Sequence, residues 1–473
     1  MRTLPSGFSD TIRNICGKHA DILLEALADS EPSLAVRVNR LKGVDVPECH
    51  APVPWLPDSG FYLEERPVFA ADPAWHQGLY YVQDASSMVM TALVRYIVDE
   101  YFSARSLRYL DACAAPGGKT IAAIETLPHG SVVLANEYDR RRASVLLENI
   151  AKHGYPEVAV SCGDAAALGR LGPVFDIVAV DAPCSGEGMM RKEPEAIRQW
   201  SEGLVESCAA MQRDILRGVW KALRPGGFMI YSTCTFNRSE DEDNVAFLID
   251  EFGAESIPVP AENIDGVVGD FSGRGLHCCR FMPGHVRGEG LFVSVVRKPE
   301  EAFSQPKMNF SAVSVPAAAN FVRRHVSGGD NYKLITTGKD SYSVVPADNA
   351  AFFAYLQRNL HLMRCGLPVC AIKGRDAVPA AELAFSTALE PYSFPELPLD
   401  RAAAMAYLHG DSLSDYDSEL PKGFILCTYN GMPLGFAKNI GRRANNLYPD
   451  AMRLRMNADS LQAAGASLVK YPV

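Results

Sequence analysis

The chain has 473 residues, 48% of them hydrophobic and 22% charged, and its formal net charge is −10. This length exceeds what one hydrophobic core supports, so about two to four domains are expected. No apolar run reaches membrane-spanning length and the first residues lack an apolar signal core, so we expect a cytoplasmic protein without a membrane anchor. Twelve sparse cysteines without a CxxC pair exclude a disulfide scaffold and a zinc ribbon, so we expect free thiols and no metal.

Residues 1–75 are expected to form an N-terminal α+β domain that binds RNA. The stretch "KHADILLEALADS" repeats apolar residues at helical spacing, and "SLAVRVNRLKG" alternates apolar and polar residues as a half-buried strand does. In that strand Val36 and Val38 would face the core. Arg37 lies between them and is therefore a candidate contact for an RNA backbone.

Strands and helices alternate through residues 76–300. Strands are expected at "SLRYLD", "SVVLANE", "EVAVSC", "FDIVAVD" and "FMIYSTC", and "GEGLFVSVVRK" follows as a final strand. Helical stretches separate them, such as "RRRASVLLENIAKHG", which ends at Gly154. The runs "IVAV" and "FMIY" are continuously apolar, as in strands that are buried on both faces. The pattern predicts a doubly wound, Rossmann-like α/β sheet with helices on both faces.

The rest of the chain is expected to contain smaller units. We interpret residues 301–320 as a linker, 321–394 as a small mixed intermediate domain and 395–473 as a separate C-terminal domain. In the C-terminal domain, "GFILCTYNGMPLGFAKNIG" contains Asn430-Gly431 between two apolar stretches. This pattern predicts a β-hairpin with a type I′ turn.

A basic patch marks the last part of the chain. Between residues 421 and 473, seven Lys or Arg residues stand against two acids, although the whole chain is acidic. Tyr429, Phe436 and Tyr448 are interleaved with them, which suits RNA backbone contact and base stacking. The alternative is a solvated basic face. The candidate RNA contacts in this region are Lys438, Arg442 and Arg443.

A Gly-rich turn, "DACAAPGGKT", follows the first strand of the predicted sheet. In such sheets ligands bind beyond the carboxyl ends of the strands, often at a helix N-terminus. A P-loop needs a glycine where Cys113 stands and a donor N–H that Pro116 lacks. The GxGxxG motif of a dinucleotide site is absent. These two interpretations are therefore weaker than a third, which is an S-adenosylmethionine site.

S-adenosylmethionine would use three successive strand ends. Gly117 and Gly118 permit a close approach of the backbone to the ligand. Glu137 stands about twenty residues further on, where acids bind ribose hydroxyls in such folds, and Asp164 ends the next strand, near the expected adenine. Each feature alone also fits a tight turn or a solvated strand end. Their order along one sheet favours the cofactor.

Two cysteines, Cys184 and Cys234, fall just past the fourth and fifth strands of the predicted sheet. Because these strands should be close together, both thiols could face one pocket. A thiolate that adds to carbon 6 of a pyrimidine pushes electron density onto carbon 5, which can then accept a methyl group. Asp181 precedes Cys184 by three residues and is placed to polarise ring nitrogen 3 and the exocyclic amino group.

Four motifs, "DACAAPGGKT", "DAPCSGEGMMRK", "ALRPGG" and "YSTCTF", resemble those of the Nol/Nop/Sun family of RNA cytosine-5 methyltransferases. Further stretches such as "LPSGF" and "GLYYVQDASSM" extend the resemblance over residues 1–298. The resemblance implies that Cys234 is the nucleophile and that Cys184 helps to break down the covalent adduct. It implies cofactor contacts at Cys113, Ala114, Ala115, Pro116, Gly117, Gly118, Lys119, Glu137, Asp164 and Asp181.

Within this family the layout is most similar to that of bacterial enzymes that act on 16S ribosomal RNA, which implies a PUA-like C-terminal RNA-binding domain. We therefore expect a monomeric, S-adenosylmethionine-dependent RNA cytosine-5 methyltransferase acting on 16S ribosomal RNA or the small ribosomal subunit. Transfer RNA as the substrate, a P-loop-like nucleotide-binding protein and a noncatalytic RNA-binding assembly factor are the alternatives. The roles of Lys192 and His285, which fall in further family motifs, stay open.

Overall fold

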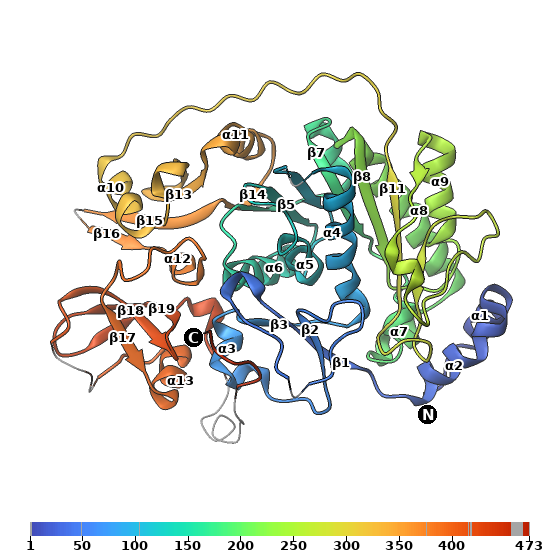
Figure 1. The fold of residues 1–473 in the computed structure, drawn as a ribbon, viewed down its shortest axis with the longest axis horizontal. Helices are drawn as coiled ribbons and strands as arrows, with labels where there is room; N and C mark the ends of the chain where they lie inside the picture. Colours follow the sequence, from blue (N-terminus) through green and yellow to red (C-terminus); the bar gives the residue numbers. More distant parts are fainter. Residues whose placement is uncertain are drawn as a thin grey trace.

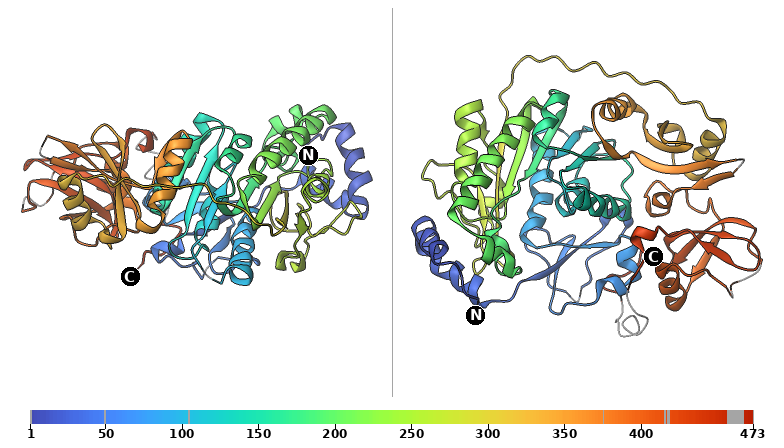
Figure 2. Two further views of the ribbon diagram at one scale, coloured as in Figure 1. Left: turned by 90° about the horizontal axis from the view of Figure 1, so that it is seen from above. Right: turned by 180° about the vertical axis from the view of Figure 1, so that it is seen from behind.

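The computed structural model describes residues 2–48, 50–103, 105–374, 376–414, 416, 419–455 and 467–472. The molecule is elongated, with the N-terminal helices at one end, the C-terminal region at the other and the central sheet between them (Figure 2). In the described ranges, no helix combines the length and the hydropathy needed to cross a membrane.

The central domain is built on one mixed sheet (Figure 1). Its strands are β4 (Arg108–Asp111), β5 (Val132–Glu137), β6 (Val158–Cys162), β7 (Phe175–Asp181), β8 (Leu223–Thr233), β9 (Glu255–Ser256), β10 (Cys279–Phe281), β11 (Leu291–Arg297) and β14 (Leu362–Cys365). The middle strands are parallel, in the order β8-β7-β4-β5-β6. β11 and β14 pair antiparallel with β8 and β6 on the two sides. The predicted doubly wound α/β sheet is confirmed, with antiparallel strands added at its edges.

Helices cover both faces of this sheet and give each face its own hydrophobic core. One face packs against α4 (Val89–Tyr101), α5 (Gly118–Ile124) and α6 (Arg140–His153), and the other against α8 (Glu202–Trp220), α9 (Glu242–Phe252) and α11 (Ala350–Asn359). The strand order reverses between β4 and β7. Such a switch point is where doubly wound sheets bind their ligands, beyond the carboxyl ends of the strands.

The N-terminal unit joins two helices to a small antiparallel sheet. Its elements are α1 (Ser6–Cys16), α2 (Ala20–Asp29), β1 (Leu34–Val38), β2 (Gly60–Leu63), α3 (Pro73–His76) and β3 (Tyr80–Val82). The sheet has the order β2-β1-β3. Because β3 pairs with β1, this unit continues past residue 75, where the sequence pattern had suggested its end.

Arg37 lies inside the molecule, with its side chain 0% exposed. Its Nη1 is 2.5 Å from Oε2 of Glu125, just after α5, and its Nε donates a hydrogen bond to Oε1 of Gln83. The expectation that Arg37 contacts RNA is therefore wrong. The sequence pattern predicted that only one face of β1 is buried, but every residue of β1 after Leu34 is buried. The guanidinium of Arg37 is therefore held by the buried carboxylate of Glu125.

The chain after β11 first crosses the central domain without helix or strand, over residues 298–315 (Figure 1). The intermediate region then contains α10 (Pro316–His325), β12 (Tyr332–Gly338), β13 (Ser341–Pro346), β15 (Leu367–Lys373), β16 (Asp376–Pro379) and α12 (Ala381–Phe385). This region is not independent of the central domain, because β14 leaves it to pair with β6.

The C-terminal unit forms a four-stranded sheet in the described residues. Its elements are β17 (Glu396–Leu399), α13 (Arg401–His409), β18 (Gly423–Tyr429), β19 (Met432–Asn439) and β20 (Ala444–Asn446). The predicted hairpin is confirmed: β18 and β19 pair antiparallel, and Asn430 and Gly431 between them have φ values of 47° and 76°. Positive φ at both central residues is what a type I′ turn requires.

The C-terminal unit packs back against the N-terminal unit, beside α3 (Figure 1). Gln77 donates hydrogen bonds through Nε2 to the carbonyl oxygens of Tyr429 and Met432. Val469 lies in the same hydrophobic cluster as residues of β1. The two ends of the chain therefore support each other on one side of the central domain.

Candidate active site at the carboxyl ends of the parallel strands

The two cysteines that follow β7 and β8 meet. The Sγ atoms of Cys184 and Cys234 lie 3.2 Å apart, and both residues are free, half-buried thiols. They meet because β7 and β8 are neighbouring parallel strands whose register pairs Asp181 with Ser232. The structure thus brings together the two thiols that the sequence pattern had placed at separate strand ends.

The surroundings of the two thiols keep Cys184 neutral and Lys119 positively charged. The hydrogen bond with Cys234 and then burial raise the pKa of Cys184 well above its ordinary value. Burial lowers the pKa of Lys119, but Asp181 and then Cys234 raise it, and the net shift is upward. A neutral Cys184 can donate its S–H to Sγ of Cys234, and a protonated Lys119 adds a positive charge to the site.

Asp181, at the end of β7, is held on both oxygens. Its Oδ2 lies 2.8 Å from Nζ of Lys119, and its Oδ1 accepts a hydrogen bond of 2.8 Å from Oγ of Ser232. The side chain of Asp181 is nevertheless 31% exposed. Its carboxylate is therefore fixed in orientation and still open to a ligand.

The Gly-rich turn leads from β4 into α5 with the backbone close to other parts of the chain. Gly117 has a φ of +113°, in the left-handed region that glycine favours, and Gly118 begins α5. A Cβ atom on Gly118 would lie 3.0 Å from Cε1 of Tyr81 and 3.5 Å from Nε2 of Gln83. The turn is thus covered by residues of the N-terminal unit, and a side chain at Gly118 would require Tyr81 to shift.

Glu137 and Asp164 lie at the ends of β5 and β6, as predicted. Glu137 is 4% exposed, and its Oε2 accepts a hydrogen bond of 3.3 Å from the N–H of Ala115 in the Gly-rich turn. Nη1 of Arg142 lies 3.7 Å from Oε1 of Glu137. Asp164 is exposed and caps the turn that follows it. Both acids therefore line the strand edge that continues from the Gly-rich turn.

Asn136 is a site residue that the sequence reasoning missed. Its Nδ2 donates to the carbonyl oxygens of Ala112 and Gly163, and its Oδ1 accepts from Oγ of Ser161. One buried amide thus ties the ends of β4, β5 and β6 together. The available signal was a lone amide in an apolar strand, because a buried amide must find hydrogen-bond partners.

The candidate RNA contacts of the C-terminal unit differ in accessibility. Arg442 and Arg443 are exposed in the turn after β19. Lys438 is 42% exposed, with its Nζ 3.5 Å from Oδ2 of Asp376 and 5.1 Å from the centre of the Phe424 ring. All three cations are thus within reach of a polyanion.

The expectation that Phe436 and Tyr448 stack on RNA bases is wrong. They are 1% and 2% exposed, respectively. The ring of Phe436 packs 4.8 Å from that of Phe394, and the ring of Tyr448 packs 5.6 Å from that of Tyr407. Both aromatic side chains belong to the hydrophobic cores beneath the basic turn.

Lys192 and His285 occupy different surroundings. Nε2 of His285 lies 3.5 Å from the carbonyl oxygen of His19, and the two imidazole rings are 5.0 Å apart, so His285 packs against the N-terminal helices. Nζ of Lys192 lies 3.6 Å from Oε1 of Glu289. Lys192 also lines a cleft of about 1040 Å³ between the N-terminal unit and the central domain.

These features define a Rossmann-like methyltransferase. They are a Gly-rich turn, an acid at the next strand end and a Lys–Asp–Cys group, all at the switch point of a doubly wound sheet. Family models agree with this class. The model of the 16S rRNA methyltransferase RsmB/F matches residues 104–297, that of the N-terminal domain of 16S rRNA methyltransferase RsmF matches residues 4–85, and that of the methyltransferase RsmF PUA domain matches residues 394–454.

Whole-chain comparison gives the same family. The ribosomal RNA small subunit methyltransferase F of Shewanella loihica is 30% identical over 436 residues, which span 87% of this chain and 86% of that protein. This chain therefore belongs to the RsmF family of 16S ribosomal RNA methyltransferases. It is an S-adenosylmethionine-dependent ribosomal RNA methyltransferase with a C-terminal PUA domain.

Solved structures share the fold of the central part. A methyltransferase homolog protein from Pyrococcus horikoshii has a TM-score of 0.50 and 26% identity, covering 62% of this chain and 95% of that one. The structure of NSun6 from Pyrococcus horikoshii with SFG, an S-adenosylmethionine analogue, has a TM-score of 0.50 and 22% identity, covering 63% of this chain and 99% of that one. The second likeness concerns the fold alone.

The residues around the Gly-rich turn fit S-adenosylmethionine. Nε2 of Gln83 is buried, lies against Gly118 and has no hydrogen-bond partner in the described part of the chain. A buried amide donor without a partner is costly unless a ligand meets it. The first N–H groups of α5 offer further donors to the same space. This polar lining suits the amino-acid part of the cofactor.

The pKa of Asp111, which lies just before the Gly-rich turn, can be tested through the pH dependence of stability. It is buried at the end of β4, accepts a hydrogen bond of 2.6 Å from Oγ1 of Thr120, and burial raises its pKa to about 7. In the unfolded chain the pKa of an aspartate is ~3.9, so the folded state binds an extra proton between these values. Stability from this group is therefore full below pH ~3.9, decreases as the pH rises from there, and is lost once the pH has risen through about 7.

The substitution Asp111→Asn places an uncharged side chain here at every pH. We expect the change that it causes in the free energy of unfolding to be more favourable at pH ~8 than at pH ~5.5, and the difference between the two changes to be roughly 2 kcal/mol. Urea unfolding of both proteins at the two pH values measures this difference. An equal effect of the substitution at both pH values would contradict the assigned titration.

Proposed function

We propose that this protein methylates carbon 5 of a cytosine in 16S ribosomal RNA through a covalent cysteine–pyrimidine adduct. The observation that carries the proposal is the 3.2 Å contact between the Sγ atoms of Cys184 and Cys234. A methyltransferase that modifies an exocyclic amino group needs no thiol, whereas carbon 5 of cytosine is too weak a nucleophile to react unaided. Two thiols beside the cofactor turn therefore favour carbon 5.

Cys234 is the nucleophile in this mechanism. Its thiolate forms a bond to carbon 6 of the cytosine, and the electrons of the C5–C6 double bond move onto carbon 5. The S–H of Cys184 and the charge of Lys119 support the thiolate before the attack. Asp181, oriented by Lys119 and Ser232, accepts a hydrogen bond from the exocyclic amino group of the base, next to nitrogen 3.

S-adenosylmethionine supplies the methyl group from its sulfonium. Gly117 and Gly118 would let the backbone approach it, Glu137 would hold the ribose hydroxyls, and Asp164 would lie near the adenine. The remaining residues of the turn, Cys113, Ala114, Ala115, Pro116 and Lys119, would line the same space.

Release of the product is the step that needs the second thiol. After methyl transfer carbon 5 carries both its proton and the new methyl group. A base removes that proton, the electrons of its C–H bond restore the C5–C6 double bond, and the bond between carbon 6 and Sγ of Cys234 breaks, so that Cys234 leaves as a thiolate. Cys184 touches the leaving sulfur and is placed to assist this elimination.

The RNA strand would reach the thiols through the cleft between the N-terminal unit and the central domain. Gln83, close to the Gly-rich turn, lines this cleft with the acids Glu31, Glu64, Asp84 and Glu193 and with the cations Arg66, Lys192 and Arg287. These cations suit phosphate groups. We propose that the cleft guides the strand and that Lys438, Arg442 and Arg443 hold a second part of the RNA, with a monomer acting in the cytoplasm on the RNA or on the small ribosomal subunit.

The cysteine roles are tested with labelled S-adenosylmethionine and ribosomal RNA that lacks cytosine-5 methylation. We expect Cys184→Ala to accumulate a covalent protein–RNA adduct on a denaturing gel, because attack proceeds but release is slowed. We expect Cys234→Ala to give neither adduct nor methyl transfer, and sequencing of RNA treated with wild type to identify the methylated cytosine. Reversed behaviour of the two variants would refute the roles, and a wild type without methyl transfer would favour a noncatalytic RNA-binding factor.

The contribution of the basic turn is tested by salt dependence. We expect Arg442→Gln with Arg443→Gln to weaken RNA binding and to reduce the slope of log affinity against log salt by about 1 to 2, since each arginine neutralises one phosphate. Filter binding over a salt series measures the slope. Arg217→Gln is the control, because Arg217 is an arginine on α8 that pairs with Glu251. An unchanged slope in the double variant would exclude the turn from the RNA interface.

A further inference from the structure

Glu240 holds the loop that carries Cys184 through the residues on either side of this cysteine, Pro183 and Ser185. The buried carboxylate of Glu240 accepts hydrogen bonds from both the N–H and the Oγ of Ser185, the residue after Cys184. It also accepts from Nε2 of Gln212, at 2.8 Å, and the same Nε2 donates to the carbonyl oxygen of Pro183, the residue before Cys184. Glu240 itself belongs to the segment that follows Cys234.

Glu187 makes the reciprocal contact from the Cys184 loop to the Cys234 segment. Its Oε2 accepts from the N–H groups of Phe236 and Asn237, at 2.7 and 3.1 Å. Its Oε1 accepts from Nε1 of Trp200 and from Nδ2 of Asn237. Glu187 is fully buried, so these donors replace water around a carboxylate.

Asn237 connects the two carboxylates. Its Nδ2 donates to Oε1 of Glu187 and to Oε1 of Glu240, and its Oδ1 accepts from the N–H of Glu240. Each carboxylate thus receives four hydrogen bonds, which fills its four lone-pair sites. We call Glu187, Asn237 and Glu240 the loop clamp.

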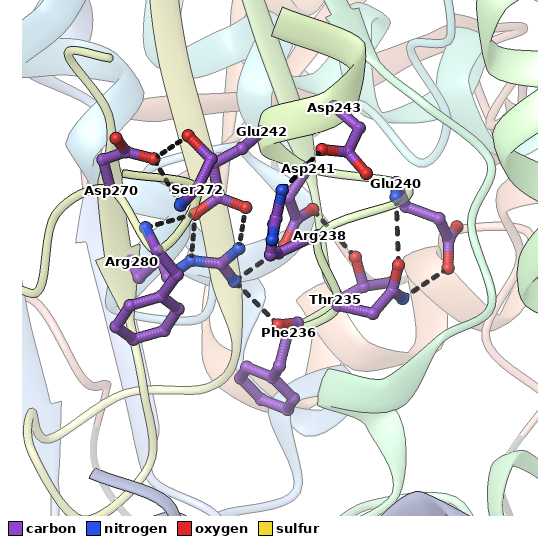
Figure 3. A network of polar contacts seen from close by, with 12 residues as sticks. Thr235, Phe236, Arg238, Glu240, Asp241, Glu242, Asp243, Asp270, Ser272 and Arg280 are labelled. Atoms are coloured by element: carbon purple, nitrogen blue, oxygen red, sulfur yellow. Dashed lines mark hydrogen bonds and ion pairs between the residues drawn. The ribbon is translucent and has the colours of Figure 1, made fainter. Parts of the chain in front are cut away.

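Cys234 is held in place by other contacts. It directly follows β8, and the hydroxyl groups of its neighbours Thr233 and Thr235 both donate to Asp241. Arg280 pairs with Asp241 and Glu242 and donates to the carbonyl oxygen of Phe236, so a buried ion cluster backs this segment (Figure 3). Cys184 lies three residues after β7, in a loop outside any helix or strand, and the Asp241 and Arg280 contacts do not reach it.

We propose that the loop clamp is a positioning device for the release step: Glu240 holds Cys184 against Cys234 and thereby enables Cys184 to resolve the covalent adduct. The inference rests on the proposed function, because it takes the roles of the two thiols from there. A weakened clamp frees the Cys184 loop while the Asp241 and Arg280 contacts keep Cys234 in place. The attack on the base therefore proceeds, and the release slows.

Two substitutions weaken the clamp to different degrees. Glu240→Gln keeps the volume but turns an amide N–H₂ toward groups that now donate to the carboxylate, so at least one bond is lost. Ser185→Ala removes only the hydroxyl bond and leaves the N–H bond to Glu240, so it tests the idea even if Glu240→Gln does not fold. Ser207→Ala is the matched control, because Ser207 is an exposed serine of α8 whose hydroxyl bonds the carbonyl oxygen of Gly203.

The experiment incubates each full-length variant with S-adenosylmethionine and ribosomal RNA and follows adduct and product over time on denaturing gels. We expect both clamp variants to accumulate the covalent adduct that Cys184→Ala accumulates, with release slowed roughly tenfold or more in Glu240→Gln and adduct formation little changed. Ser207→Ala should behave as wild type.

The outcomes separate the inference from the proposed function. If Cys184→Ala accumulates adduct but the clamp variants match wild type, or lose adduct formation and product together, the positioning role is refuted and the thiol roles stand. If Cys184→Ala itself gives no adduct, the thiol roles fail and the inference fails with them.

Discussion

The contact between the Sγ atoms of Cys184 and Cys234 is the constraint on which the proposed chemistry depends. It exists because β7 and β8 are adjacent and parallel, so both strands end on the same edge of the sheet. The same edge holds Asp181 at the end of β7 and the Gly-rich turn after β4. One feature of the topology, the reversal of strand order between β4 and β7, therefore assembles thiols, carboxylate and cofactor turn from three distant parts of the sequence.

Close backbone approach and buried charge maintain this assembly. A Cβ atom on Gly188 would lie 2.8 Å from the carbonyl oxygen of Cys234, so the two loops can touch only where a glycine stands. Behind them, four buried acids, Glu187, Glu240, Asp241 and Glu242, are each met by hydrogen-bond donors or by Arg280. Buried carboxylates cost stability unless every lone pair is met, but a fully satisfied network fixes one geometry.

Sequence reasoning succeeded where local pattern determines the structure. Alternating strands and helices predicted the central sheet, and strand ends located Cys184, Cys234 and Asp181 on one edge because parallel strands share that edge. The Asn430-Gly431 pair predicted the hairpin because few residues tolerate two positive φ values in a row.

It failed where docking between units decides a residue's surroundings. Arg37 alternates with valines, which suggested solvent, but the packing of β1 near α5 brings Glu125 to it. Phe436 lies among basic residues along the chain, yet its side chain points into a core shared with Phe394. Phe236 and Asn237, whose N–H groups donate to Glu187, lie about fifty residues away, so no local spacing could have indicated this role.

The most direct test of the account is to locate the base on the protein. Cys184→Ala would be incubated with S-adenosylmethionine and ribosomal RNA, digested with nuclease and protease, and examined by mass spectrometry for a peptide that carries a nucleotide. The account predicts a methylated cytidine attached to the sulfur of Cys234. A nucleotide on another residue, or a methylated product formed without any protein–RNA adduct, would contradict it.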